Sequence, residues 1–587
     1  MCPGGHSPPV KDTNRLHFIQ LSHADDVRPI ATAPTSEMSS VSSVLKAGLK
    51  ASDGRGARQK AVKSKFSRAT GEVYKMINAR RIALASVAAL AWGGAAQAAD
   101  LPVKAKPVSY VKVCDLYGAG FFYVPGTETC IKLGGYVRVN AYLGSSGGAP
   151  YAGAGAGGTN AFSNRQQTKD FNFRTRAWLT ADARSQTAWG TLRSYYALQF
   201  TNSGPGDTST GTAVPRAFIQ FAGFTIGRTT SAFDTPDANS SLTNSITTQI
   251  GGTTSSSGIN AFQYTAQFGG GLSATIAVES SDQRRFGVIN ASEAGNFFNF
   301  TTAGTVTNSS LSGNSGTGIG SSWPEFVANI DITQKWGSAR LVGALHNISG
   351  DYYTAGALGA GPGCAAGTPA TCGRPGEAWG YAIAAGFTLN QIPGLPGDNF
   401  GVTVGYTSGA TGYAVNSLTN VAILKGSQLT VGGLADGIYV NNSGVEPIRT
   451  WYATAAYQHR WSPTLRSSIF GGYINVSYTG TAKGWICGTG AGAPAGASPT
   501  TPAGTGFAGV TNCNPDFNFW QLGSRIFQWT PVSNLSIGLD VVYNRYNSAF
   551  SGSAVTPAVG PNPAGVRTLG GNDVWMVGLD VRRNFWP

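Results

Sequence analysis

Charged residues are scarce in this sequence, and histidine is scarcer still. Lysine, arginine, aspartate and glutamate make up 12% of the 587 residues, about half the share usual in soluble domains. Of five histidines, only His346 and His459 follow residue 99. Catalytic and metal sites need such residues at fixed geometry, and no Cys-x-x-Cys or Cys–His cluster is present. We therefore expect no catalytic residue, no metal and no cofactor.

Long hydrophobic runs are also missing, with one short exception near the N-terminus. Arg80 and Arg81 precede an apolar stretch that ends at about Trp92, and Ala96-Gln97-Ala98 follows it. A short positive segment, a short apolar core and an A-x-A site are typical of a secretory signal peptide, whereas a membrane-spanning helix needs ~20 apolar residues. We predict a signal peptide over residues 76–98, cleaved between Ala98 and Ala99. A helix of a folded N-terminal domain is the alternative.

Residues 1–75 precede this segment and are polar, without a sustained apolar period. Because signal peptides begin a chain, we expect translation to start at Met76 and residues 1–75 to be an upstream extension; a disordered long leader is the alternative. The formal net charge of +14 is concentrated here, since residues 1–99 carry a surplus of eight positive charges. The basic balance is therefore weak evidence for a nucleic-acid partner.

The cysteines are consistent with export. Cys2 lies in the leader, and six cysteines remain after residue 99. They fall as three pairs that are local in sequence: Cys114 and Cys130, Cys364 and Cys372, Cys487 and Cys513. An even number in an exported chain favours disulfides, with the connectivity left open.

Alternating side chains are the main positive signal. In FNFRTRAWLTADAR, residues 171–184, one face carries Phe171, Phe173 and Leu179 and the other carries Arg174 and Arg176. Successive side chains of a strand point to opposite faces, so this strand lies between an apolar medium and water.

Similar segments recur along the chain, and we count sixteen strands between about residues 134 and 586. Every second connection is short, and the others run from a dozen to more than thirty residues. A soluble sandwich has no reason for this asymmetry. It is typical of a transmembrane barrel with short periplasmic turns, long extracellular loops and an even strand number. We therefore predict an all-β, 16-stranded antiparallel transmembrane barrel over residues 99–587.

Aromatic residues near the expected strand ends fit the interfacial girdles of such a barrel. The candidates are Tyr142, Trp189, Trp451, Tyr478 and Trp529.

Arginines occupy the polar faces of neighbouring strands. They are Arg138, Arg174, Arg176, Arg193 and Arg216. A narrow barrel cannot bury so many charges without partners, whereas a water-filled barrel of 16 strands can hold them. We expect these side chains to line the lumen and to bias which solutes pass.

The motifs VCDLYGAGFFYVPGTETCIKLGGYVRV (113–139), RAFIQFAGFTIGR (216–228) and the terminal VRRNFWP resemble the general porins of alphaproteobacteria, of the rhizobial type. The resemblance covers nearly all of residues 100–587. It implies a trimeric outer-membrane barrel that passes small hydrophilic solutes, with a third loop folded into the lumen. It also implies that Cys114 and Cys130 form the N-terminal pair.

On this resemblance, the segment after FTIGR is the constriction loop, and Asp234 and Asp237 face the five arginines. The implied surroundings are outer-membrane lipid and lipopolysaccharide, further copies of the chain, and the barrel assembly machinery. The favoured function is a passive diffusion channel in the cell outer membrane. An adhesin or structural anchor that acts through its long loops is the alternative, and an outer-membrane enzyme is a weaker one. Nucleic acid is not expected, because the alternation places the charges inside.

Overall fold

The computed structural model describes residues 112–144, 171–203, 210–236, 250–254, 257–292, 299–300, 306–307, 311–312, 323–350, 374–390, 392–415, 420–490, 497–499, 502, 509–556 and 563–585. They belong to one compact unit, Val108–Pro587. The expected leader, the signal peptide, Asp237, Cys364 and Cys372 lie outside the described residues. Within them, no helix is long and apolar enough to span a membrane.

Sixteen strands form the wall of this unit. In chain order they are β2 (Cys130–Leu143), β3 (Phe171–Thr187), β4 (Gly190–Ser203), β5 (Thr210–Phe221), β6 (Phe224–Thr229), β7 (Ile259–Gly269), β8 (Leu272–Glu279), β13 (Glu325–Gln334), β14 (Gly337–Ile348), β15 (Ala378–Leu389), β16 (Asn399–Ser408), β21 (Arg449–Arg460), β22 (Leu465–Ser477), β24 (Phe517–Trp529), β25 (Leu535–Asn547) and β28 (Asn572–Asn584).

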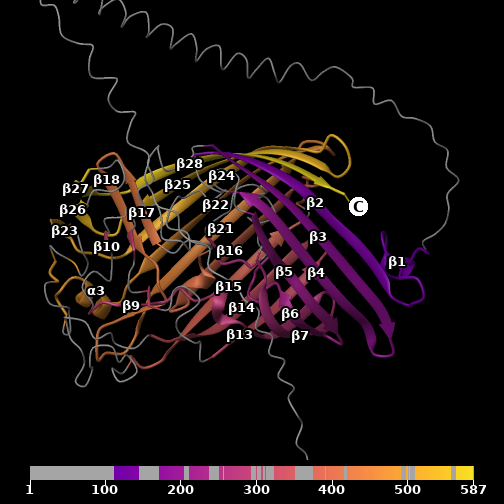
Figure 1. Cartoon of the computed structure of the whole chain (residues 1–587), viewed down its shortest axis with the longest axis horizontal. Coiled ribbons are helices and arrows are strands. Elements are labelled where there is room, and N and C mark those ends of the chain that lie inside the picture. The colour runs from indigo at the N-terminus through magenta and orange to yellow at the C-terminus, as the bar shows by residue number, and fades with distance from the viewer. Residues whose placement is uncertain are drawn as a thin grey trace, which may run out of the picture. The chain divides into compact units, whose positions relative to one another are not determined.

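Each of these strands pairs antiparallel with the next (Figure 1). The last strand pairs with the first, from Tyr136↔Asn584 to Leu143↔Val577. The sheet therefore closes on itself without a free edge, as lipid requires of a spanning sheet. The predicted 16-stranded antiparallel barrel is confirmed.

The connections also alternate in length. Two residues join β3 to β4, and two join β5 to β6, whereas residues 409–448 join β16 to β21. One expectation was wrong in detail: the connection from β4 to β5, at the end with long connections, has only six residues, 204–209.

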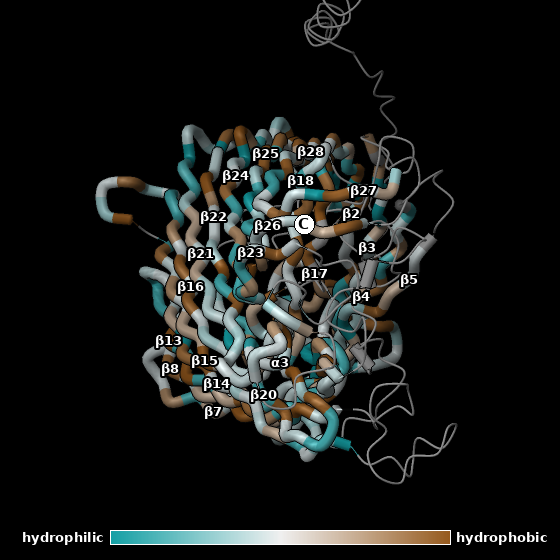
Figure 2. Tube along the Cα trace, turned by 90° about the vertical axis from the view of Figure 1, so that its left-hand side faces the viewer, coloured by the Kyte–Doolittle hydropathy of each residue, from teal (hydrophilic) through white to brown (hydrophobic). Residues whose placement is uncertain are grey.

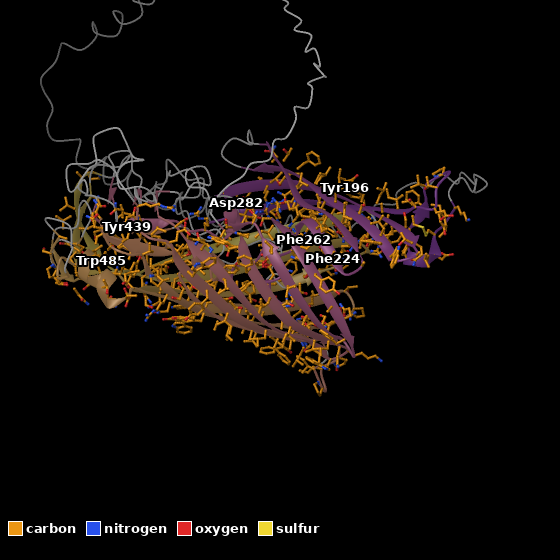
Figure 3. All side chains as sticks on the ribbon, turned by 90° about the horizontal axis from the view of Figure 1, so that it is seen from below. Tyr196, Phe224, Phe262, Asp282, Tyr439 and Trp485 are labelled. Atoms are coloured by element: carbon orange, nitrogen blue, oxygen red, sulfur yellow. A yellow bond between two sulfur atoms is a disulfide. The ribbon has the colours of Figure 1, made fainter. Side chains whose placement is uncertain are left out.

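The two faces of the wall differ as the sequence predicts. Val137, Phe171 and Leu179 are exposed on the outer face, and the alternation of hydrophobic and hydrophilic residues is visible along the strands in Figure 2. Tyr196 and Phe262 also point outward (Figure 3). Since the inner positions carry the polar residues, the apolar surface faces lipid and the barrel interior faces water.

The expected aromatic girdle is only partly present. Trp189, Trp451 and Trp529 are exposed, but Tyr142 is 0% and Tyr478 is 5% exposed. Tyr142 lies on the inward-facing side of β2. Tyr478 follows the end of β22 and donates a hydrogen bond to the carbonyl of Gly433 at 3.0 Å. Both tyrosines are therefore interior residues. Strand parity turns Tyr142 inward, and the packing of the connections buries Tyr478.

Long connections combine into a packed cap at one end of the barrel (Figure 1). A five-stranded sheet joins β17 (Asn420–Lys425), β18 (Gln428–Gly433), β27 (Gly565–Leu569), β26 (Ser551–Thr556) and β23 (Val510–Asn512). The short helix α3 (Gly480–Ile486) packs with it, and a buried core contains Val431, Leu434, Ile438, Trp485 and Phe550. Sequence reasoning treated these connections as plain loops; they carry a hydrophobic core of their own.

Smaller elements complete the described chain. β9 (Val288–Asn290), β12 (Leu311–Ser312), β19 (Gly437–Tyr439) and β20 (Glu446–Pro447) form a four-stranded sheet, and β10 (Asn299–Phe300) pairs with β11 (Val306–Thr307). Three 3-10 turns are η2 (Asp115–Tyr117), η4 (Ser281–Gln283) and η6 (Thr411–Tyr413).

Two of the three cysteine pairs lie in the described residues, and both are disulfides. Cys114–Cys130 ties η2 and β1 (Phe122–Tyr123) to the start of β2. Cys487–Cys513 joins the end of α3 to the chain before β24. Each bond closes a connection at one end of the barrel, away from the middle of the strands.

Candidate functional site

Seven arginines project inward from five adjacent strands, β28, β2, β3, β4 and β5. They are Arg138, Arg174, Arg176, Arg184, Arg193, Arg216 and Arg582, and we call this surface the arginine wall. Arg138 lies opposite Arg176 on one neighbouring strand and opposite Arg582 on the other. All five arginines expected in the lumen belong to the wall.

One carboxylate organises the part of the wall nearest to the seam between β2 and β28. The Nε of Arg138 donates to Asp580 Oδ1 at 2.5 Å, and Asn140 Nδ2 donates to the same oxygen at 2.6 Å. Arg174 donates from Nε and Nη2 to Asn140 Oδ1 at 3.1 and 2.7 Å. Asp580 thus neutralises one of several guanidinium groups, and the local charge stays positive.

A second carboxylate, Asp182, lies between two arginines farther along the wall. Arg184 Nη2 and Arg193 Nε donate to it at 2.7 and 2.9 Å. Arg193 also donates from Nη1 to Gln220 at 2.8 Å. These bonds orient the guanidinium planes of Arg184 and Arg193, because a carboxylate binds the fork of an arginine in its plane.

Across the interior from the arginine wall, part of the β6–β7 connection lies against the inner surface of the barrel. We call residues 231–236 and 250–254 the inner segment. Glu279 accepts hydrogen bonds from Ser231 Oγ at 2.7 Å and from the Ala232 amide at 2.6 Å. Asn329 on β13 donates to the Ala232 carbonyl at 2.6 Å, and Arg340 on β14 donates to the Asp234 carbonyl at 2.5 Å. The expected in-folded loop is therefore present in its described part.

Small residues on the inner surface make room for this segment. Ala232 and Phe233 pack against an apolar cluster that includes Ala277, Val327, Val342, Ala344, Ala382 and Ala384. At Gly386 on β15 there is no room for a side chain, since a Cβ placed there would lie 2.7 Å from the Cβ of Thr235. Small residues on the inner surface of these strands thus make room for the described part of the segment.

The expected role of Asp234 needs correction. Its carboxylate forms an ion pair with Arg284 Nη2 at 3.0 Å, and the two side chains are 7% and 2% exposed. The Thr254 amide donates to it at 2.7 Å, which ties the two parts of the inner segment together. Asp234 is therefore a structural anchor and not an open carboxylate of the lumen. Asp237 lies outside the described residues.

Burial and charge act against each other at Arg284. Burial alone would lower the pKa of its guanidinium, but the nearby Asp234, Tyr413 and Glu279 raise it above the usual value. Burial raises the pKa of Tyr413, and the carboxylate of Glu325 raises it further. The arginine stays charged and the tyrosine neutral, so both keep their hydrogen bonds over a wide range of pH.

A second buried network joins the barrel to the cap. Glu325 accepts from Tyr413 at 2.9 Å and lies 2.7 Å from Nδ1 of His346. The other ring nitrogen of His346 lies 3.3 Å from Asp436, whose other oxygen accepts from the Thr411 amide. These bonds connect β13, β14 and η6 with the chain between β18 and β19, so His346 is a bridging residue.

Groups of histidine, cysteine and carboxylate suited to a metal ion are absent from the described part of the chain. Sequence reasoning missed three charged residues that matter here, Arg184, Arg582 and Arg284. Strand parity could have identified the first two, since Arg184 shares the parity of Arg176 on β3 and Arg582 shares that of Asp580 on β28. Arg284 follows η4 in the β8–β13 connection, where no periodicity indicates a partner.

Comparisons with known proteins show the family of the chain. A family model described as "Porin subfamily" matches residues 100–576. Porin Omp2b of Brucella canis is 34% identical over 221 residues, which cover 35% of this chain and 54% of that protein. Porin Omp2b of Brucella suis is 34% identical over 220 residues, covering 35% and 52%. The chain thus spans about half the length of the curated relatives it matches. Among solved structures, the outer-membrane channel DcaP of Acinetobacter baumannii has 14% identity and a TM-score of 0.46, covering 79% of this chain and 99% of that one.

Proposed function

The chain belongs to the porin subfamily, and from this premise we propose that it forms a water-filled channel through which small hydrophilic solutes and ions diffuse passively across the outer membrane. The observation that carries the proposal is the interior of the closed barrel. An arginine wall with polar partners lies on one side, and the inner segment lies against the other side. In a barrel whose interior is plugged and dry, burying seven guanidinium groups would cost much free energy. Their presence therefore favours a water-filled interior.

The charge balance supports a preference for anions. On β28 and β2–β5 the inward residues include seven arginines and Lys132, against Asp182 and Asp580. The described carboxylate of the inner segment, Asp234, is already paired with Arg284. A wall on which guanidinium groups outnumber carboxylates favours anions over cations.

The surroundings of the barrel follow from its outer face. Exposed apolar residues on every strand pair match the acyl chains of outer-membrane lipid and lipopolysaccharide. We propose that the chain self-associates into trimers, and that the barrel assembly machinery inserts it. Catalysis has no part in this proposal.

Single-channel recording of the refolded chain, residues 99–587, in a planar bilayer tests the proposal. The expected result is stable conductance steps that close in groups of three, and a reversal potential under a KCl gradient with the sign of chloride preference. A cation-type reversal potential would contradict the anion preference.

A second function is favoured by one observation, the packed core of the cap. Connections that fold into a stable sheet can present a fixed binding surface. If the barrel is folded but silent in the bilayer, the diffusion proposal fails, and an adhesin or anchor that acts through the cap replaces it.

A further inference from the structure

Guanidinium groups and aromatic rings stack repeatedly along the arginine wall. Arg582 lies over the ring of Tyr136 at 4.1 Å, and Arg174 lies over Tyr142 at 5.3 Å. Farther along, Arg193 lies over Tyr195 at 5.1 Å and over Phe218 at 5.4 Å, and Arg184 lies over Phe121 at 5.0 Å. Four arginines of the wall therefore have an aromatic face as their neighbour.

The aromatic rings also stack on one another. Tyr136 lies directly opposite Trp178, with ring centres 5.8 Å apart and an angle of 11° between the planes. Tyr195 and Phe218 are 5.2 Å apart at 25°. These near-parallel pairs are typical of offset stacking, and each has an arginine beside it.

Register places these groups at regular intervals. Tyr136 is two residues from Arg138, and Trp178 is two residues from Arg176, which lies opposite Arg138. Two residues of a strand span about 7 Å. Each stacked pair therefore has a guanidinium group within the length of a small aromatic acid: Arg138 and Arg176 for Tyr136 and Trp178, and Arg193 for Tyr195 and Phe218.

One chemical class fits both features. A carboxylate binds a guanidinium fork with two hydrogen bonds, and a flat ring stacks on tyrosine, tryptophan or the guanidinium plane itself. Resting on the channel proposed above, we propose that the arginine wall is a series of weak binding sites for small aromatic carboxylates, of which benzoate is the simplest. Several weak sites in a row suit transport, since solutes must leave each site as readily as they enter it.

The nearby side chains leave room for this exchange. Tyr136, Trp178, Tyr195 and Phe218 are all partly exposed on the inner face, and Arg193 keeps 26% of its side chain accessible. Arg184, on the other side of Asp182, keeps 27% of its side chain accessible. The guanidinium groups are thus held in place by Asp182, Asp580 and Asn140 without being saturated by them.

Bi-ionic reversal potentials test the proposal. The permeability of benzoate is compared with that of cyclohexanecarboxylate, which has the same charge and nearly the same size but lacks a flat π-face. We expect the wild-type channel to favour benzoate by roughly two- to tenfold, the range that aromatic stacking supplies. Equal permeability of the two anions would overturn the inference.

Two variants locate the effect on the wall. Tyr136→Leu should bring the benzoate preference close to one, whereas Tyr196→Leu, on the lipid-facing side of β4, should leave it unchanged. Arg582→Lys keeps the charge but removes the planar group, so it should lower the benzoate preference. If both Tyr136→Leu and Arg582→Lys fold and keep the wild-type ratio, the wall is not the site.

Chloride conductance separates the two proposals. A barrel that conducts chloride normally but passes benzoate and cyclohexanecarboxylate equally well refutes only the aromatic preference. A folded barrel that conducts nothing refutes the channel itself.

Discussion

Asp234 and Arg284 form a buried ion pair at 3.0 Å between the inner segment and the β8–β13 connection. Removing one partner of a buried pair leaves an uncompensated charge, which typically costs about 3–5 kcal/mol. We expect Arg284→Met to destabilise the inner segment by an amount in this range and to give noisier, larger conductance steps. Single-channel recording and thermal unfolding measure both effects.

The matched control for this change is Asp282→Asn, which alters an exposed carboxylate two residues away (Figure 3). The double variant Asp234→Asn/Arg284→Met removes both charges and should recover part of the lost stability. If Arg284→Met leaves current noise and unfolding unchanged, the ion pair does not hold the segment.

Gly386 lies under the inner segment, where the barrel wall has no room for a side chain. A Cβ at this position would lie 2.7 Å from the Cβ of Thr235, closer than van der Waals contact. Gly386→Val should therefore push the segment toward the arginine wall and reduce single-channel conductance. Ala385→Val introduces the same side chain on the lipid-facing side of the same strand and should leave the conductance unchanged. Equal conductance in the two variants would contradict the described path of the segment.

Asp398 links stability to pH in the turn between β15 and β16. It accepts hydrogen bonds from Tyr457 at 2.5 Å and from the Arg460 amide at 2.9 Å, and His459 Nδ1 lies 2.8 Å away. Burial acts to raise the pKa of Asp398, but these bonds outweigh it and hold the pKa below its usual value. The stability that this carboxylate contributes is present above the unfolded pKa of about 4 and is lost as the pH falls through the folded pKa.

Asp398→Asn should therefore lower the unfolding temperature at pH 7, and the gap from wild type should shrink as the pH drops below about 4. Unfolding curves at pH 7, 5 and 3 measure the gap, with Asp115→Asn, an exposed residue, as the control. A gap of constant size across this range would show that the carboxylate charge is not what matters.

The disulfide Cys114–Cys130 should stabilise the barrel by restricting its unfolded state. Its sequence separation of 16 residues corresponds to about 3 kcal/mol in the chain-entropy model. We expect Cys130→Ser to lower the free energy of unfolding by that amount, as measured by urea unfolding of the refolded barrel. Cys114→Ser/Cys130→Ser should match the single variant, since either change removes the same bond. A further loss in the double variant would mean that the thiols act in another way.

The barrel could be predicted from the sequence because lipid and water impose a strict alternation of apolar and polar residues on every strand. Phe171, Leu179 and Arg174 could each be placed on the correct face from parity alone. Tyr142 could have been placed in the same way, since it shares the parity of Arg138 and Asn140; treating it as a girdle residue ignored that signal.

What could not be predicted are partners that join distant connections. Parity reports the face of a residue but not its neighbour across the interior. For this reason Asp234 was expected opposite the arginine wall, although Arg284, 50 residues away, neutralises it. The cap could not be predicted for a similar reason. Its strands come from three separate connections, and each strand alone is too short to indicate a hydrophobic core.

The seam between β2 and β28 has a consequence for how the barrel is made. Arg138 and Asp580 meet across it although 442 residues separate them in the chain. Contacts of such long range are slow to form, because a long loop must be closed before they bring any gain. A chain that ends before β28 leaves β2 and β25 as open edges, which pair readily with other strands. Only a chain synthesised through β28 can therefore pair β2 with β28 and close the barrel. Until then its open edges remain prone to aggregation.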